Sequence, residues 1–170
     1  SQNTICSSNS IGIIECMIKK QSKLPSYIFV GFQLALFVLL IFLPTNPSFS
    51  LTYANIIANT LLIGGILICL VAIWQLRKYS LTALPAPVNN AKLLTTGLYK
   101  YVRHPIYTGV ILAFAGVALG SQSTIKLLLW LALIVFFIIK SGYEEDLLIK
   151  QFSGYKKYRS TSGRFLPKLN

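Results

Sequence analysis

Charged residues, and acidic ones above all, are scarce in this sequence. Only 12% of its 170 residues are charged, against roughly 25% in an ordinary globular protein, and just four of them are acidic. Hydrophobic residues make up 54%. So few charges do not suffice to cover a domain of this size with a water-facing surface, and the composition therefore argues against an ordinary soluble domain.

Metal-ligating residues are also few. The sequence has one histidine, His104, and three cysteines, Cys6, Cys16 and Cys69, whose spacing fits no metal-binding motif. Cys69 lies inside an apolar run, where a free cysteine usually behaves as a small hydrophobic residue. We therefore predict no metal site.

What the sequence has instead is long apolar runs that are almost free of charge. About 20 helical residues cross the hydrocarbon core of a bilayer. The second run is long enough alone and the first with its flanks, whereas the third and fourth are short and are expected to form a tight pair. The runs cover residues 27–43, 53–76, 105–120 and 124–141.

These runs predict the fold class. We expect an all-α integral membrane bundle of about four transmembrane helices, forming a single domain over residues 27–170 with a polar tail at 142–170. Residues 1–26 precede it as a cytoplasmic or interfacial segment, because they lack the long apolar core and small-residue cleavage site of a signal peptide.

The basic residues orient this bundle. The net charge is +12, and of the sixteen lysines and arginines only Lys126 falls on the side of the loop 44–52, which has no charge at all. An excess of basic residues marks the cytoplasmic face, so both termini are predicted to be cytoplasmic, in a bacterial cytoplasmic membrane or the endoplasmic reticulum. The charge also attracts anionic lipid head groups, and nucleic acid is not expected as a partner.

The stretch "YVRHPIYTG" at 101–109 contains the only histidine. Proline is favoured as the first residue of a helix, so Pro105 is expected to open the third span with His104 just outside it. The free N–H groups of such a helix start suit an anion, and Arg103 adds a positive charge. A purely structural alternative is that these side chains only anchor the helix at the interface.

Three of the four acidic residues follow the fourth run, where the helix is expected to continue. Asp146 has Lys150 four residues later, which favours a pair on the helix surface. Glu144 and Glu145 have no comparable partner on the helix. Because the connection between the third and fourth spans is short, these spans should be antiparallel neighbours. The glutamates would then meet His104 in a pocket that offers both signs of charge to a zwitterionic ligand.

Together these motifs carry a resemblance. "LLTTGLYKYVRHPIYTG" and the later "EEDLL" resemble the membrane isoprenylcysteine carboxyl methyltransferase and phospholipid methyltransferase family over residues 93–167. The resemblance implies S-adenosylmethionine as cofactor, in a cytoplasmic pocket formed by the middle loop, the last two spans and the C-terminal tail. By similarity, the cofactor contacts are Leu93, Leu94, Tyr99, His104, Pro105, Ile106, Tyr107 and Glu144. Lys140 takes the place of an arginine that touches substrate in the carboxyl methyltransferases.

The predicted activity is methyl transfer to a lipidic or prenylated acceptor from the bilayer, most simply a carboxylate. A carboxylate is ionised at neutral pH, so it needs positioning more than proton transfer. The candidate catalytic residues are Lys140, Glu145, Arg103 and Arg164, of which the three basic ones would hold the carboxylate.

Three alternatives stay open. The first is methylation of a phospholipid amine, which would first have to lose a proton from a group with a pKa near 10, while His104 is engaged by the cofactor. The second is an NADPH-dependent reductase, because reductases of the sterol type have a similar motif around a histidine and a proline. A non-enzymatic four-span scaffold would bind no cofactor. The sequence does not indicate the oligomeric state.

Overall fold

The computed structural model describes residues 23–44, 46–77 and 93–168. The predictions for residues 1–22, including Cys6 and Cys16, and for most of the loop between the second and third apolar runs lie outside the described residues.

The described part of the chain is all-helical, as predicted. Its one β-type pairing is an isolated bridge between Val102 and Gly163. The helices, in chain order, are α2 (Lys23–Phe42), α3 (Ala54–Arg77), α4 (Leu98–Tyr101), α5 (Pro105–Gly120), α6 (Thr124–Gln151) and α7 (Tyr155–Thr161).

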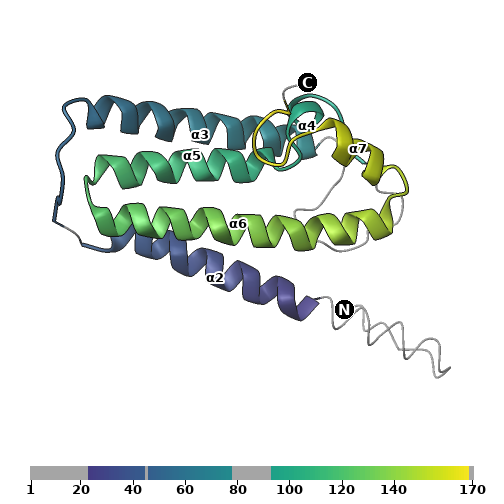
Figure 1. Ribbon diagram of the computed structural model, residues 1–170, viewed down its shortest axis with the longest axis horizontal. Helices are drawn as coiled ribbons and strands as arrows, with labels where there is room; N and C mark the ends of the chain where they lie inside the picture. The colour runs from purple at the N-terminus through teal and green to yellow at the C-terminus, as the bar shows by residue number, and fades with distance from the viewer. Residues whose placement is uncertain (1–22, 45, 78–92, 169–170) are drawn as a thin grey trace.

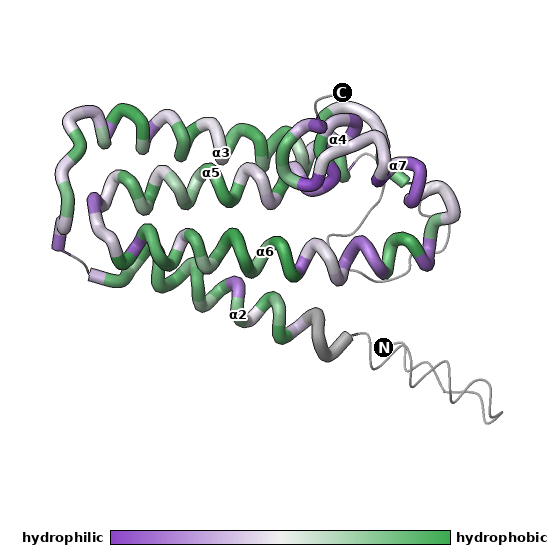
Figure 2. The backbone as a smooth tube through the Cα atoms, in the orientation of Figure 1, coloured by the Kyte–Doolittle hydropathy of each residue, from purple (hydrophilic) through white to green (hydrophobic). Residues whose placement is uncertain are grey.

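The four long helices lie alongside one another and alternate in direction (Figure 1). The short helices α4 and α7 gather at the end of the bundle where α3 ends and α5 begins. Hydrophobic residues dominate the long helices, and hydrophilic ones concentrate at the end formed by α4, α7 and the last turns of α6 (Figure 2). The bundle therefore has an apolar body and one strongly polar end.

The surface of this body suits lipid and not water. In α3 the buried residues are small, Ala54, Ala58, Gly65 and Ala72, while large apolar side chains such as Trp74 are exposed. Helices α3 and α6 are long and apolar enough to cross a membrane, whereas the apolar parts of α2 and α5 are shorter. Exposed apolar area on this scale indicates a membrane or binding surface, and the chain is an integral membrane protein.

Small residues bring α3 and α5 into close contact. A Cβ atom on Gly65 would lie 2.4 Å from the backbone nitrogen of Ala113, and one on Gly116 would lie 2.4 Å from the carbonyl oxygen of Ala58. Small residues at such interfaces let helix backbones approach closely in membranes. As a result α5 packs most extensively against α3 and less against α6.

The fourth run corrects one expectation from the sequence. The third and fourth runs were predicted to form a tight pair, yet the close partner of α5 is α3. The helix was also predicted to continue beyond the fourth run, and α6 does so, reaching Gln151 over 28 residues. The charges of Lys140 and the acidic run end the apolar run in the sequence, but they do not end the helix, because the apolar residues continue beyond them.

A core of large apolar side chains joins α2 to α6. Leu36 and Leu40 of α2 are buried with Leu133, Phe136 and Phe137 of α6. This packing fixes α2 against the helix that bears Lys140 and both glutamates, so α2 also takes part in forming the polar end of the bundle.

Candidate active site

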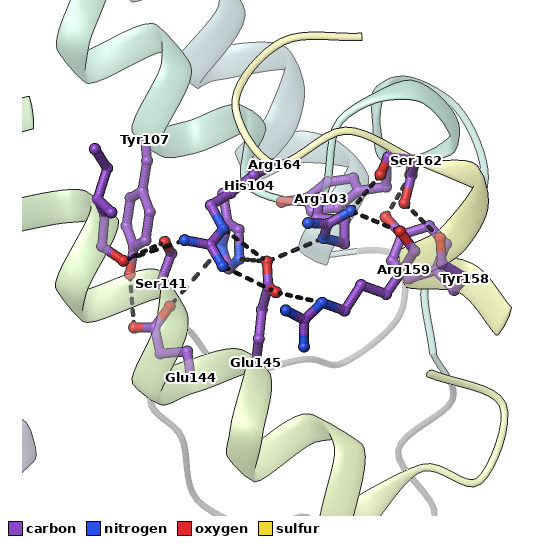
Figure 3. Close-up of polar contacts among 12 residues, drawn as sticks. Arg103, His104, Tyr107, Ser141, Glu144, Glu145, Tyr158, Arg159, Ser162 and Arg164 are labelled. Atoms are coloured by element: carbon purple, nitrogen blue, oxygen red, sulfur yellow. Dashed lines mark hydrogen bonds and ion pairs between the residues drawn. The ribbon is translucent and has the colours of Figure 1, made fainter. Parts of the chain in front are cut away.

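His104 lies at the start of α5, between two glutamates of α6. It is the N-cap residue of the helix that Pro105 begins, as the sequence predicts. Its Nδ1 lies 3.9 Å from an oxygen of Glu144, and its Nε2 lies 3.3 Å from an oxygen of Glu145. Figure 3 shows the ring directed toward both carboxylates. The histidine therefore connects two acidic residues that have different surroundings.

Glu144 interacts with Tyr107. The phenol of Tyr107 donates a hydrogen bond of 2.6 Å to Glu144 Oε1. The rings of Tyr107 and His104 stack with an angle of 2° between their planes and 5.3 Å between their centres. The carboxylate of Glu144 is only partly buried, so it keeps the capacity to accept hydrogen bonds from a ligand.

Glu145 interacts with a cluster of three arginines. Arg103 Nε donates a 3.0 Å hydrogen bond to its Oε1, and Arg159 and Arg164 each place Nε at 3.4 Å from one of its oxygens. Glu145 is buried. These arginines come from the segment between α4 and α5, from α7 and from the segment after α7, so one carboxylate ties three segments to α6.

The segment after α7 is held against His104 by the backbone as well. The amide of Arg103 donates to the carbonyl of Gly163 at 2.9 Å, and the amide of His104 donates to the carbonyl of Arg164 at 3.1 Å. Gly163 has no room for a side chain, since a Cβ would meet the carbonyl oxygen of Leu166. The C-terminal segment thus fixes the position of the histidine.

Helix α7 is attached to α4 in a similar way. The Tyr158 phenol donates a hydrogen bond to the carbonyl oxygen of Tyr99, and a guanidinium nitrogen of Arg103 donates to the carbonyl oxygen of Ser162. Burial raises the pKa of Tyr158 to about 12, so its phenol stays protonated at neutral pH and remains a donor.

Helix α4 is placed by α3. Gly97 precedes it with a φ of 63°, a conformation that glycine adopts without strain, and a Cβ there would collide with the side chain of Gln75. Gln75 Oε1 accepts a 3.0 Å hydrogen bond from the amide of Leu98, the first residue of α4. Leu94 and Tyr99 then pack against Ala72 of α3.

These segments line an open cavity of about 390 Å³ at the polar end of the bundle. This size falls within the roughly 300–1,000 Å³ of sites for small molecules and cofactors. All eight residues predicted to contact the cofactor lie in its wall, namely Leu93, Leu94, Tyr99, His104, Pro105, Ile106, Tyr107 and Glu144.

The four candidate catalytic residues divide into two groups. Arg103 and Lys140 line the cavity, whereas Glu145 and Arg164 lie outside its lining, in the arginine cluster. Lys140 Nζ lies 5.3 Å from the centre of the Tyr107 ring, and it donates a 2.7 Å hydrogen bond to Gln33 Oε1 of α2.

The cavity also has lining residues that the sequence reasoning did not select. Gln33 could have been noticed, because a lone amide in an apolar membrane helix usually has a function. The others are apolar or aromatic residues, together with one further glutamine, at positions that carry no distinctive signal. They are Leu76, Leu147, Leu148, Gln151, Phe152, Tyr155 and Tyr158.

Asp146 differs from its two acidic neighbours. It is exposed on α6, and the ion pairs among the described residues do not include the predicted pair with Lys150. That prediction was wrong, and the reason is that a pair on an exposed helix surface gains only about 0–1 kcal/mol, which water easily replaces.

Comparison with known proteins decides the family. The profile of the phospholipid methyltransferase family matches residues 53–154, more than half of the chain. This chain belongs to the phospholipid methyltransferase family. The match runs from the start of α3 to just beyond the end of α6, so it contains every residue of the cavity wall except Gln33 of α2 and the two tyrosines of α7.

A curated relative gives a second comparison within these methyltransferases. The chain is 34% identical over 94 residues to a protein named methanethiol S-methyltransferase from Pseudomonas deceptionensis. The aligned region covers 54% of this chain and 35% of that relative. The chain therefore matches about a third of the relative's length.

Proposed function

We propose that this protein is an S-adenosylmethionine-dependent methyltransferase that acts on an acceptor from the bilayer. The observation that carries the proposal is the cavity at the polar end of the bundle, where His104, Tyr107 and Glu144 lie together with Arg103 and Lys140. All five residues belong to the region that matches the methyltransferase family.

The residues of the cavity wall fit the cofactor. S-adenosylmethionine has two cationic groups, a carboxylate and a flat adenine. Glu144 supplies a carboxylate for a cationic group, Arg103 supplies a cation for the carboxylate, and the rings of Tyr99 and Phe152 supply apolar faces. Aromatic faces also attract sulfonium-type cations. The chemistry of the wall therefore suits a zwitterionic cofactor.

When bound, S-adenosylmethionine supplies a methyl group on cationic sulfur: the acceptor's lone pair forms the new bond to this carbon, and the electrons of the broken sulfur–carbon bond stay on the sulfur. The protein's part is to hold the two reactants in line, which can lower the barrier by several kcal/mol. Tyr107 and His104 orient Glu144 for this task. Leu147 and Leu148 add further apolar lining to the same cavity.

A carboxylate of a lipidic or prenylated molecule is the acceptor that we favour. Lys140 of α6 lines the cavity and would attract and orient an anionic nucleophile. An amine would have to deprotonate from a pKa near 10, and it would acquire its positive charge beside that of Lys140. A thiolate is a second candidate, favoured by the name of the curated relative, and as an anion it would use Lys140 in the same way.

A substitution at Lys140 separates these acceptors. Palmitate, hexadecanethiol and hexadecylamine share one tail, so single-turnover rates between about pH 6 and 9 compare the head groups alone. We expect a rate on palmitate that does not depend on pH and that falls roughly ten- to a hundredfold in Lys140→Ala, the usual effect of losing a hydrogen bond to a charged group.

The other outcomes identify the other acceptors. A rate on the thiol that rises with pH, as the thiolate fraction grows, and that falls in Lys140→Ala assigns the thiolate. A rate on the amine that rises throughout and does not depend on Lys140 contradicts an anionic nucleophile.

Cofactor binding tests the function as a whole. A thermal shift of the purified protein with S-adenosylhomocysteine is expected, since a ligand at 100 times its dissociation constant adds about 2.7 kcal/mol to stability. A shift with NADPH alone would instead support a reductase. A protein that responds to neither would be the non-enzymatic scaffold.

The same proposal includes the topology. We place α2, α3, α5 and α6 across the membrane, with the cavity and both termini on the cytoplasmic side. The support is that α2 and α5 lie alongside the two long apolar helices (Figure 1), and that Lys126, the one basic residue predicted on the outer side, lies in the first turn of α6 at the opposite end of the bundle from the cavity. Anionic lipid head groups would contact the basic residues of the cytoplasmic end.

A further inference from the structure

Gln33 is a polar residue in the middle of α2, a helix that is otherwise apolar over residues 27–42. It is half-buried and lies in the cavity wall, where it is the only contribution from the described side chains of α2, those of residues 27–42. Polar side chains inside membrane helices are costly and usually functional. The question is which function this amide has.

The contact with Lys140 accounts for the carbonyl oxygen of the Gln33 side chain but not for its N–H groups. An ammonium group donates hydrogen bonds and accepts none, so the Gln33 atom that bonds to Lys140 at 2.7 Å is the carbonyl oxygen Oε1. The two N–H groups on Nε2 make no hydrogen bond with any described residue. A purely structural bond between α2 and α6 would leave these donors without a role.

Together the two side chains make one wall of the cavity a donor surface. Gln33 offers the N–H groups of its amide, and Lys140 offers the remaining N–H groups of its ammonium. The lysine is held from two sides, by Gln33 Oε1 and by the face of the Tyr107 ring. The phenol of the same Tyr107 donates a hydrogen bond to Glu144, which is the acceptor part of the cavity.

The position of α2 is fixed well enough to make this geometry specific. Phe29 and Phe32 place their rings 6.0 and 5.3 Å from that of Phe136, and Phe29 also lies 5.6 Å from the ring of Tyr143. These contacts lie within one turn of Gln33 on α2 and of Lys140 on α6. The amide is therefore presented to the cavity by a packed helix and not by a loop.

Helix α2 also lies outside the part of the chain that matches the methyltransferase family, which begins at residue 53. The residues assigned to the cofactor all lie inside that match. The donor surface is thus built from one residue within the match, Lys140, and one outside it, Gln33. The residues assigned to the cofactor therefore lie within the match, whereas the donor surface extends beyond it.

We infer that Gln33 determines the choice of methyl acceptor: its amide donates to the anionic group of the acceptor, while its carbonyl holds Lys140 toward the same group. This inference rests on the proposed function. It assigns α2 as the helix that discriminates between anionic and cationic acceptors, a carboxylate and a thiolate being the two anions that the wall would accept.

The test uses the full chain in nanodiscs and compares three variants. Gln33→Leu removes the amide, and Gln33→Glu keeps an oxygen for Lys140 but replaces the N–H donors by a negative charge. Leu34→Ala is the control, because Leu34 is 55% exposed on the lipid-facing side of the same helix. Affinity for S-adenosylhomocysteine is measured first, and all three variants are expected to bind it as the unsubstituted protein does.

The second measurement is binding of palmitate to the protein already saturated with S-adenosylhomocysteine, a readout that needs no turnover. Gln33→Leu is expected to weaken palmitate binding about ten- to a hundredfold, as the loss of hydrogen bonds to a charged group does. In a separate turnover assay, Gln33→Leu should raise the KM for palmitate more than it lowers kcat. Gln33→Glu is expected to abolish palmitate binding and to strengthen hexadecylamine binding. Leu34→Ala should change neither.

Each outcome decides something. If the unsubstituted protein does not bind S-adenosylhomocysteine, both the proposed function and this inference fail. If it binds, and both Gln33 variants bind palmitate as Leu34→Ala does, the inference fails alone and the proposed function stands. If Gln33→Leu does not fold, Gln33→Glu still decides, because an unchanged preference for palmitate over hexadecylamine would overturn the inference.

Discussion

Glu145→Gln is expected to lower the free energy of unfolding by about 3 kcal/mol and to release the C-terminal segment. Glu145 and Arg103 are 1% and 7% exposed, and breaking a buried ion pair by removing one partner typically costs about 3–5 kcal/mol. We place the effect at the low end because Arg159 and Arg164, at 45% and 30% exposure, can turn to water and contribute little.

Chemical unfolding in detergent and limited proteolysis measure these two effects. Trypsin should cleave after Arg159 and Arg164 much faster in Glu145→Gln, because the carboxylate that ties α7 and the following segment to α6 is gone. Asp146→Asn is the matched control on the next residue of the helix, and an exposed substitution should stay within about 0.5 kcal/mol. Equal stability of the two variants would show that the cluster does not hold the segment.

Glu144→Gln should act on the cofactor instead. We expect the dissociation constant for S-adenosylmethionine to rise roughly ten- to a hundredfold, which corresponds to the loss of a hydrogen bond to a charged group. The substituted amide can still accept the hydrogen bond from Tyr107, so the arrangement of the wall and the stability of the protein without ligand should change little.

Isothermal titration of Glu144→Gln, Asp146→Asn and the unsubstituted protein checks this prediction. Asp146 is exposed and does not line the cavity, so Asp146→Asn should bind the cofactor normally. An unchanged affinity in Glu144→Gln would remove Glu144 from the cofactor site, and an equal loss in Asp146→Asn would mean that the net charge of the acidic run matters and not the position of one carboxylate.

The features that could be read from the sequence are those that local chemistry controls. Scarcity of charge together with long apolar runs predicts membrane helices, because a helix that crosses the hydrocarbon core needs about 20 predominantly apolar residues. Pro105 marks the first residue of α5 because its missing N–H costs nothing there. The lack of a helix partner for Glu144 and Glu145 was also a correct signal, since both have partners on other elements.

The sequence did not separate the roles of these two neighbours. Successive residues of a helix point about 100° apart, so Glu144 faces the cavity while Glu145 faces the arginines of the C-terminal segment. Which of the two glutamates meets the arginines depends on where the segment around Gly163 is attached. Backbone hydrogen bonds between residues 101–104 and 163–164 make that attachment.

The partner of Lys140 was likewise decided by tertiary structure. Gln33 lies more than a hundred residues away in the chain, and nothing in either local sequence predicts the contact. It exists because α2 packs on α6 through Leu36, Leu40 and the phenylalanines. By itself the sequence determined the class of protein and the residues that carry charge. Only the packing of the helices decided which charges meet, because contacts between side chains depend on the register between helices, and this is set by how large and small residues interlock.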